Sequence, residues 1–323
     1  MSDTRKVATV IGNNKFVEGY VVERLVKAGY VVRVAVPQPA LVNTLRPFGN
    51  VGHISPLYCS VTQEHTVIRA IEGAEVVVNL SELSFGKNKT KLDIYNVKAA
   101  QNIARISAAA GVKKLIHFSA LGAELNSRSA YLVSKKKGED AVLEAFSSAV
   151  ILRTSIVFGP EDQFLNKLGM IASYFPIMPV YNVNTKLQPV YVGDVADAVM
   201  KVVQQPETAG KIYELAGQEA YTNRELMTWL VEWLRTNNDI SGLSPALIRL
   251  AAFSLQFMPG ALMTPALLNM MEYDSVLSQK ENGLMALGIV PKTLEMIAPI
   301  YLYCYRSVND FTELKKLQHR IEQ

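Results

Sequence analysis

Short apolar segments alternate with amphipathic helical patterns through the first two thirds of the chain, and this alternation restricts the fold more than any other feature. Segments that are apolar throughout are typical of strands with both faces buried, and helical connections between them favour parallel pairing. We therefore expect an α/β fold built on a doubly wound parallel sheet. The expected strands cover residues 7–11, 29–36, 74–80, 112–120 and 149–159.

The pattern changes after Gly159, where helical spacing and then a proline-rich loop replace the alternation. One strand and one helix return in QPVYVGDVADAVMKVVQQP, and GKIYELAG supplies another short strand before a mainly helical end. We expect a Rossmann-like domain at residues 1–158, continued by 187–218. A smaller, mainly helical C-terminal domain then covers 159–186 and 219–323.

The charge balance argues against one broad class of partner. Lys and Arg number 33 against 29 Asp and Glu, which leaves a net charge of +4 in 323 residues. These charges are scattered rather than blocked, so no nucleic-acid-binding surface is indicated. Cys59 and Cys304 lie far apart and the four histidines are unclustered, so we expect neither a disulfide framework nor a metal site.

Residues 244–271 form an unusually apolar stretch, SPALIRLAAFSLQFMPGALMTPALLNMM. Arg249, Pro259 and Pro265 interrupt it, so it lacks the roughly 18 uninterrupted apolar residues of a membrane span. It still holds more apolar side chains than a two-helix turn at the edge of a small domain can readily bury. We expect it to dock a membrane-embedded partner or the bilayer interface. The alternative is that it closes over the domain's own substrate cleft.

The segment YLVSK places Tyr131 and Lys135 one turn apart on one helix face, and Ser119 ends the preceding strand. This set resembles the Ser, Tyr and Lys constellation of the extended and atypical short-chain dehydrogenases/reductases. The resemblance implies that Tyr131 exchanges a proton with a substrate oxygen, that Lys135 holds the cofactor ribose and that Ser119 orients the substrate. The alternative is that Tyr131 packs and forms hydrogen bonds within the protein while Lys135 is solvated. His117 is interpreted as a structural neighbour of Ser119.

Longer segments resemble the NDUFA9-like accessory-subunit family of respiratory complex I and its bacterial relatives. They are HFSALGA, SAYLVSKKKGEDAV, ILRTSIVFGPEDQFLNKL, QPVYVGDVADAV, AGKIYELAG and LMALGIVPKTLEMIAPIYLYCYR, in the family's order. VFGPEDQFLN followed by QPVYVGDVA is the most specific part. The resemblance covers nearly the whole chain and implies complex I subunits as partners.

The resemblance assigns cofactor contacts to the turn after the first strand and to two later positions. They are Gly12, Asn14, Lys15, Phe16, Val17, Asn79 and Lys135. The family's second and third loop glycines are replaced here by Lys15 and Glu18. The last glycine normally lets helix and strand approach closely. A carboxylate in this turn competes with a bound diphosphate, and Lys15 could offset that effect.

Two further positions depart from the family. Pro37 stands where a basic residue would meet an adenosine 2′-phosphate, and Glu82 stands where the backbone would approach the cofactor closely. NAD(P)H binding is therefore possible in architecture, but we expect it to be weak or lost.

Two functional hypotheses remain. The first is a non-catalytic accessory or assembly subunit of NADH:quinone oxidoreductase that uses a reductase fold as a scaffold. The second is a free-standing NAD(P)-dependent reductase or epimerase that uses Tyr131 as proton donor and acceptor. Because the first expected strand begins at Val7, we expect no signal or transit peptide in this sequence. We expect the bacterial cytoplasm, peripheral on the inner membrane, or the mitochondrial matrix side if a presequence was removed.

Overall fold

The computed structural model of this chain describes residues 6–12, 15–40, 42, 45, 49, 52–81, 88–241, 244–255, 265–278 and 282–306. The chain divides into two compact units. The first comprises Met1–Thr154, Gly193–Leu215 and Ser278–Ile289, and the second comprises Ser155–Val192, Ala216–Leu277 and Val290–Gln323. The first unit thus includes Ser278–Ile289, which the sequence-based division had assigned to the smaller domain.

The first unit is built on a seven-stranded sheet in which every pair of neighbours is parallel, with the order β11-β6-β5-β4-β1-β2-β3. This confirms the expected doubly wound parallel sheet. Its strands are β1 (Val7–Ile11), β2 (Val31–Val36), β3 (Ile54–Tyr58), β4 (Val76–Asn79), β5 (Lys114–Ala120), β6 (Val150–Thr154) and β11 (Ile212–Leu215). Strand order reverses between β1 and β4, and in such sheets ligands bind outside the carboxyl ends of the strands at that point.

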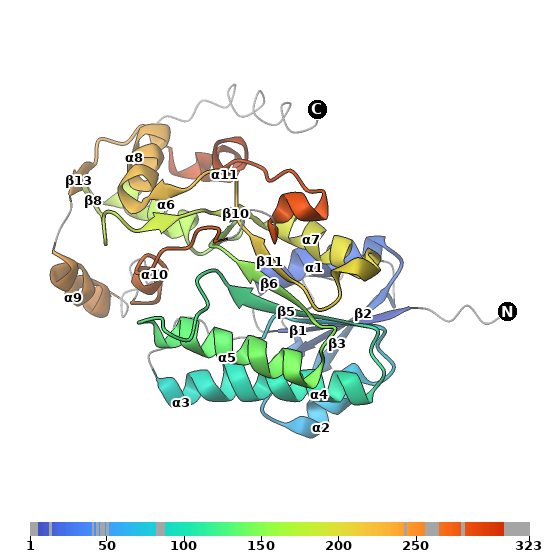
Figure 1. Ribbon diagram of the computed structural model, residues 1–323. Coiled ribbons are helices and arrows are strands. Elements are labelled where there is room, and N and C mark those ends of the chain that lie inside the picture. The colour runs from blue at the N-terminus through green and yellow to red at the C-terminus, as the bar shows by residue number, and fades with distance from the viewer. Residues whose placement is uncertain are drawn as a thin grey trace. The chain divides into compact units, whose positions relative to one another are not determined.

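Helices cover both faces of this sheet. Figure 1 shows α2, α4 and α5 on one side and α1 and α7 on the other. Their bounds are α1 (Lys15–Lys27), α2 (Glu64–Ile71), α4 (Ala99–Ala109), α5 (Ala130–Ala145) and α7 (Val192–Gln204). Strand residues Ile11, Val77, Leu115 and Ile151 pack with Ile103 of α4 in one buried cluster. The apolar strands therefore supply both the sheet and the core of this unit.

A close approach of two helical segments fixes the position of α5. Between α3 (Lys89–Leu92) and α4, the chain forms the π-helix η2 (Asp93–Lys98). A Cβ atom on Gly138 of α5 would lie 2.2 Å from the carbonyl oxygen of Asn96 in η2. Only glycine permits this contact, so Gly138 brings α5 against η2. At the start of α5, the Ser129 side chain accepts a hydrogen bond from the Leu132 amide and caps the helix.

The second unit is mainly helical, as expected for the C-terminal region. Its helices are α6 (Leu165–Tyr174), α8 (Asn223–Leu234), α9 (Pro245–Leu255), α10 (Pro265–Met270) and α11 (Leu294–Leu302), followed by the short η6 (Tyr303–Tyr305). Three two-stranded sheets accompany them: β7 (Val157–Phe158) with β10 (Val190–Tyr191), β9 (Lys186–Leu187) with β12 (Tyr221–Thr222), and β8 (Ile177–Pro179) with β13 (Asp239–Ser241). Apolar residues of α6, α8 and α11 share one buried cluster.

The expected strand at 149–159 proved to be two strands. β6 belongs to the seven-stranded sheet of the first unit, whereas β7 pairs with β10 in the second unit. The chain changes units at Ser155, whose hydroxyl donates to the carbonyl oxygen of Ser275, 3.0 Å away. The polar residues Arg153, Thr154 and Ser155 mark the break in a segment that is otherwise apolar.

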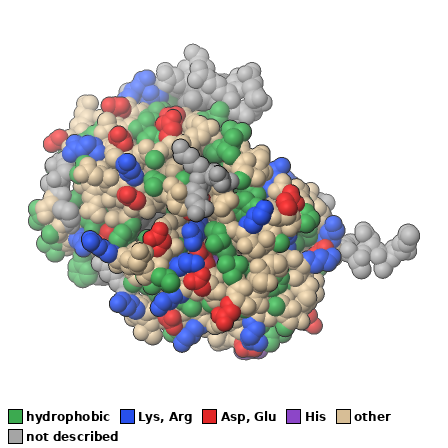
Figure 2. Space-filling view, viewed as in Figure 1, with side chains coloured by type: hydrophobic (Ala, Val, Ile, Leu, Met, Phe, Trp, Pro, Cys, Tyr) green, Lys and Arg blue, Asp and Glu red, His purple; other side chains and the backbone are tan. Residues whose placement is uncertain are grey.

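Within the described residues, no helix is both long and apolar enough to cross a bilayer. On the face shown in Figure 2, Lys and Arg side chains lie among Asp and Glu side chains rather than apart from them. Such a mixed distribution produces no extended field of one sign on that face.

Candidate functional site

The candidate site lies at the carboxyl ends of the central strands, where the fold places ligands. Gly12 follows β1, and Asn79 ends β4 directly beside Ile11 of β1. Ser119 lies near the end of the next strand, β5. The sheet therefore brings residues from three distant segments to the same edge.

Lys135 is buried, with only 2% of its surface exposed, and its Nζ donates a hydrogen bond to the Phe118 carbonyl oxygen at 2.8 Å. Tyr131, one turn earlier on α5, is also buried. The alternative in which Lys135 is solvated is therefore wrong. The ammonium group is held against the backbone of β5 because α5 packs closely on that strand.

Ser119 donates its hydroxyl proton to a carboxylate oxygen of Glu139, at an Oγ to Oε1 distance of 2.5 Å. The direction is fixed because an ionised carboxylate only accepts hydrogen bonds. Glu139 is fully buried and also receives Nε and Nη2 of Arg153, at 2.9 and 2.7 Å. The single proton of Ser119 is thus used inside the protein rather than offered to a ligand.

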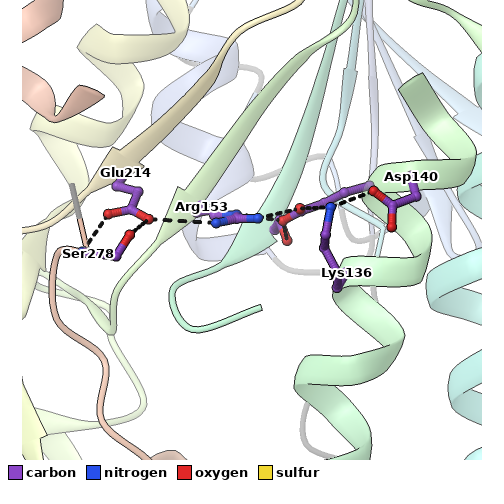
Figure 3. Close-up of polar contacts among 7 residues, drawn as sticks. Lys136, Asp140, Arg153, Glu214 and Ser278 are labelled. Atoms are coloured by element: carbon purple, nitrogen blue, oxygen red, sulfur yellow. Dashed lines mark hydrogen bonds and ion pairs between the residues drawn. The ribbon is translucent and has the colours of Figure 1, made fainter. Parts of the chain in front are cut away.

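The Arg153 guanidinium joins two buried carboxylates, as Figure 3 shows. Its Nη1 lies 3.7 Å from Oε1 of Glu214, and Glu214 in turn accepts from the amide and hydroxyl of Ser278. The hydrogen bond to Glu139 raises the pKa of Arg153 above its ordinary value. Lys136 pairs with Asp140 beside this network.

Sequence reasoning missed Glu139 and Arg153, although a signal was present. Glu139 follows Tyr131 and Lys135 at the same four-residue interval, so all three share one face of α5. Arg153 is the one charged residue of β6, VILRT. A charge in a strand that is otherwise buried implies a partner of opposite charge.

A second group of hydrogen-bonded polar side chains consists of Asn79, Ser81 and His117, and His117 lies two residues before Ser119 on β5. Asn79 Oδ1 accepts from the amide and hydroxyl of Ser81, so its Nδ2 must be the donor to Nδ1 of His117, 3.0 Å away. The proton of His117 therefore resides on Nε2, which has no hydrogen-bond partner in the described part of the chain. Burial and the charge of Lys135 lower the pKa of His117 to about 3. A neutral imidazole of this kind agrees with its interpretation as a structural residue.

The π-helix fixes the first turn of α5 as well. Asn96 donates from Nδ2 to Oγ of Ser134 at 3.0 Å, and Ser134 donates to the Tyr131 carbonyl oxygen at 2.7 Å. Asn96 is buried and was not identified from the sequence. These bonds hold the backbone that carries Tyr131, so the position of this tyrosine depends on η2.

The first turn of α1 holds a carboxyl group where the dinucleotide fold has a glycine. Glu18 is 2% exposed, and its Oε1 would lie 2.0 Å from a Cβ atom on Gly12. Oε1 has no partner among the described residues, and burial raises the pKa of Glu18 to about 8. The Glu18 side chain thus lies between the end of β1 and the start of α1, at the position of the family's third glycine, which normally lets helix and strand approach closely.

The other predicted cofactor residues give less information. Phe16 and Val17 lie in the first turn of α1, with Val17 buried. Asn14 and Glu82 lie outside the described residues, as does the side chain of Lys15. Their assigned contacts stay predictions.

Pro37 follows β2 and is exposed. Dinucleotide folds read the adenosine ribose with an acidic residue for the 2′-hydroxyl or a basic one for a 2′-phosphate. Proline offers neither kind of charge at this position. Among the described residues, no group of three His, Cys, Asp or Glu side chains is arranged to hold a metal ion.

The parallel sheet, its reversal point beside Gly12 and the Tyr131 and Lys135 pair on α5 define a Rossmann-type protein of the extended short-chain dehydrogenase/reductase class. The model of the NAD dependent epimerase/dehydratase family matches residues 8–216. The chain therefore belongs to that family.

Two mitochondrial proteins confirm the resemblance that the motifs predicted. Subunit 9 of the NADH dehydrogenase [ubiquinone] 1 alpha subcomplex from Dictyostelium discoideum is 33% identical over 232 residues, which cover 71% of this chain and 64% of that protein. Its counterpart from Arabidopsis thaliana is 29% identical over 315 residues, which cover 93% and 78%. The match thus spans slightly less than two thirds of the Dictyostelium protein.

Proteins named for enzymatic activities are similar as well. A ceramide reductase from Caulobacter vibrioides is 27% identical over 249 residues, which cover 77% of this chain and 75% of that protein. The crystal structure of an NADPH-dependent quinone oxidoreductase from Escherichia coli superimposes with a TM-score of 0.69 at 19% identity, covering 97% of this chain and 99% of that one. At this identity the structural likeness establishes the fold alone.

Proposed function

We propose that the chain is a non-catalytic accessory or assembly subunit of NADH:quinone oxidoreductase, with a dinucleotide site that is weakened or lost. The observation that carries the proposal is the buried carboxyl group of Glu18, in the first turn of α1, against Gly12 at the end of β1. The similarity to subunits of the mitochondrial enzyme supplies the proposed assembly.

The hydrogen bonds that Ser119 and Lys135 form within the protein support the same proposal, because the family's enzymes would use these two residues in catalysis. Ser119 gives its proton to Glu139, and Lys135 donates to the Phe118 carbonyl oxygen. Both bonds stabilise the packing of α5 on β5, which a scaffold needs as much as an enzyme does.

Helix α9 offers the surface for a membrane-embedded partner or the bilayer interface. Leu247, Leu250 and Phe253 recur every third residue and are 59%, 64% and 60% exposed. Ile248 and Ala252, on the other side of the helix, belong to the core of the second unit. The exposed row is therefore not needed for folding, which favours docking over closure of a cleft. Residues 256–264 of the apolar stretch lie outside the described residues, and Leu268 and Met271 at its end are buried in the same core.

The proposed location is peripheral, on the cytoplasmic face of a bacterial inner membrane or on the matrix side in mitochondria. The direct test is purification of a tagged chain from membranes of its own source in mild detergent. We expect the core subunits of NADH:quinone oxidoreductase to be recovered with it. Elution of the chain alone, with the enzyme fully assembled in its absence, would overturn the proposal.

The loss of the dinucleotide site has its own test. Calorimetric titration of the purified chain with NADH and with NADPH is expected to give weak binding or none. Submicromolar affinity for either dinucleotide would contradict this part of the proposal and leave the subunit assignment standing.

A second candidate function is an NAD(P)-dependent reductase or epimerase. The retention of Tyr131 and Lys135 on one buried face of α5 favours it, as does the similarity to a ceramide reductase. Replacing Tyr131 with Phe keeps the ring and removes only the hydroxyl group. A Tyr131→Phe chain that assembles normally but loses the cellular function would favour this enzyme.

A further inference from the structure

The Glu18 side chain, in the first turn of α1, is buried against Gly12 at the end of β1. We propose that Glu18 is an internal plug that keeps adenine dinucleotides out by volume, and that removing this one side chain restores binding. The inference rests on the proposed loss of the dinucleotide site and names its cause.

The contact between Glu18 and Gly12 is close along the whole carboxyl group. A Cβ atom on Gly12 would lie 2.0 Å from Oε1, 2.8 Å from Cδ and 3.3 Å from Cγ of Glu18. Gly12 itself is held at the end of β1 by a hydrogen bond from its amide to the Ala35 carbonyl oxygen, 3.2 Å away. Glu18 lies in the first turn of α1. The carboxyl group therefore fills the space between the end of the strand and the start of the helix.

The way this carboxyl group is buried indicates exclusion by volume rather than by charge. Its Oε1 has no hydrogen-bond partner among the described residues. Burial, the one cause of the shift, raises the pKa of Glu18 to about 8, so the group is mainly protonated at pH 7. A neutral group exerts little repulsion on a phosphate, so the exclusion acts through the volume of a side chain held between the end of β1 and the start of α1, where the family's third glycine lets strand and helix approach closely.

The surroundings of the plug retain the features of a dinucleotide site. Helix α1 starts directly after the turn, so its first amide groups are directed at this space. Asn79 of β4 is in register with Ile11 of β1, on the far side of the point where strand order reverses. Pro37 carries no charge that would select between a free ribose and a 2′-phosphate. The restored site should accept NADH and NADPH with similar affinity.

The test uses the full chain and four variants titrated with NADH and NADPH by calorimetry. Glu18→Gly removes the plug, and we expect its affinity to be at least about tenfold higher than that of the wild-type chain. Glu18→Gln keeps the volume without the acid, so it should bind as weakly as wild type. Glu23→Gly places a glycine in the same helix away from the turn and serves as the matched control.

Glu18→Ala, the fourth variant, is a second route if glycine in the first turn prevents folding, and it should bind more tightly than wild type. A folded Glu18→Gly or Glu18→Ala chain that binds no better than wild type would refute the plug and leave the proposed function intact. An equal gain in Glu18→Gln would show that charge rather than volume excludes the dinucleotide, and would also refute it. Tight binding by the wild-type chain would instead contradict the proposed loss of the site.

Discussion

Arg153 and Glu139 form a two-pronged ion pair inside the first unit, with Nε and Nη2 at 2.9 and 2.7 Å from the two carboxylate oxygens. Glu139 is fully buried, so its charge has no access to solvent. Such a carboxylate is tolerated only because the guanidinium and the Ser119 hydroxyl satisfy it. The pair joins α5 to β6 and thereby fixes the helix that carries Tyr131 and Lys135.

Replacing Arg153 with Met should destabilise the chain strongly. The substitution removes the two-pronged cation from the buried carboxylate of Glu139 and leaves only the Lys136 ammonium, 3.9 Å from Oε2. Breaking a buried pair in this way typically costs about 3–5 kcal/mol in the free energy of unfolding. The measurement is urea unfolding followed by circular dichroism. Arg105→Met is the matched control, because Arg105 pairs with Glu64 on the surface, where such pairs contribute about 0–1 kcal/mol. Equal losses in both variants would contradict a special role for the buried pair.

The sequence predicted the sheet well and the polar network hardly at all. Runs such as VVRVAV and VVVN identify buried parallel strands because their mainly apolar pattern can be read from a few neighbouring residues. Strand β3, ISPLY, was missed because it is only partly buried and contains Pro56, which edge strands tolerate. The partnership of Glu139 with Arg153 depends on how α5 packs across β5 and β6, and no local pattern encodes that packing.

The first-turn carboxyl group was recognised from the sequence, but its state was not. A surface glutamate beside the helix dipole would be ionised, whereas Glu18 is buried and mainly neutral at pH 7. Burial depends on the tertiary contact with Gly12. The residue type at position 18 therefore indicates a departure from the family, and the structure shows that its carboxyl group is buried against the retained Gly12.

Stability should fall as pH rises through the range in which Glu18 titrates. Burial raises the pKa of this carboxyl group from 4.5 to about 8, so between these values the native chain holds a proton that the unfolded chain releases. The free energy of unfolding therefore decreases with rising pH in this window, by up to about 1.4 kcal/mol per pH unit from this group. Glu18→Gln does not titrate, so its Tm relative to wild type should rise from pH 5 to pH 8. A constant difference across the range would argue against the buried neutral acid.

Tyr301→Phe should weaken the second unit through Asp162. The tyrosine hydroxyl donates to Oδ2 of this buried carboxyl group at 2.7 Å, and the amides of Phe164 and Leu165 donate to Oδ1. Asp162 thus ties the loop of the VFGPEDQFLN motif to α11. Loss of a hydrogen bond to a charged group costs about 1.5–3 kcal/mol. Thermal unfolding measures the effect.

Tyr221→Phe is the control for Tyr301→Phe. Its hydroxyl also donates to a carboxylate, that of Glu295 at 2.7 Å, but in an exposed contact. Water can replace an exposed hydrogen bond, so this variant should lose little stability. If Tyr301→Phe lost no more stability than Tyr221→Phe, the hydrogen bond from Tyr301 to Asp162 would not stabilise the second unit as its buried contacts suggest.

Helix α9 provides the last prediction, because its two faces should respond to mutation in opposite ways. Leu250→Ser combined with Phe253→Ser changes only exposed side chains, so the Tm should stay near that of wild type while recovery with membranes or with the respiratory enzyme falls. Ile248→Ser, on the buried face, should lower the Tm because it places a hydroxyl group in the core. Met285→Ser, at an exposed apolar position in η5 (Leu284–Leu287) of the first unit, controls for general loss of surface hydrophobicity and should keep association intact. A lower Tm with unchanged association in the α9 double variant would mean that these residues cover the chain's own interior, and that the docking surface lies elsewhere.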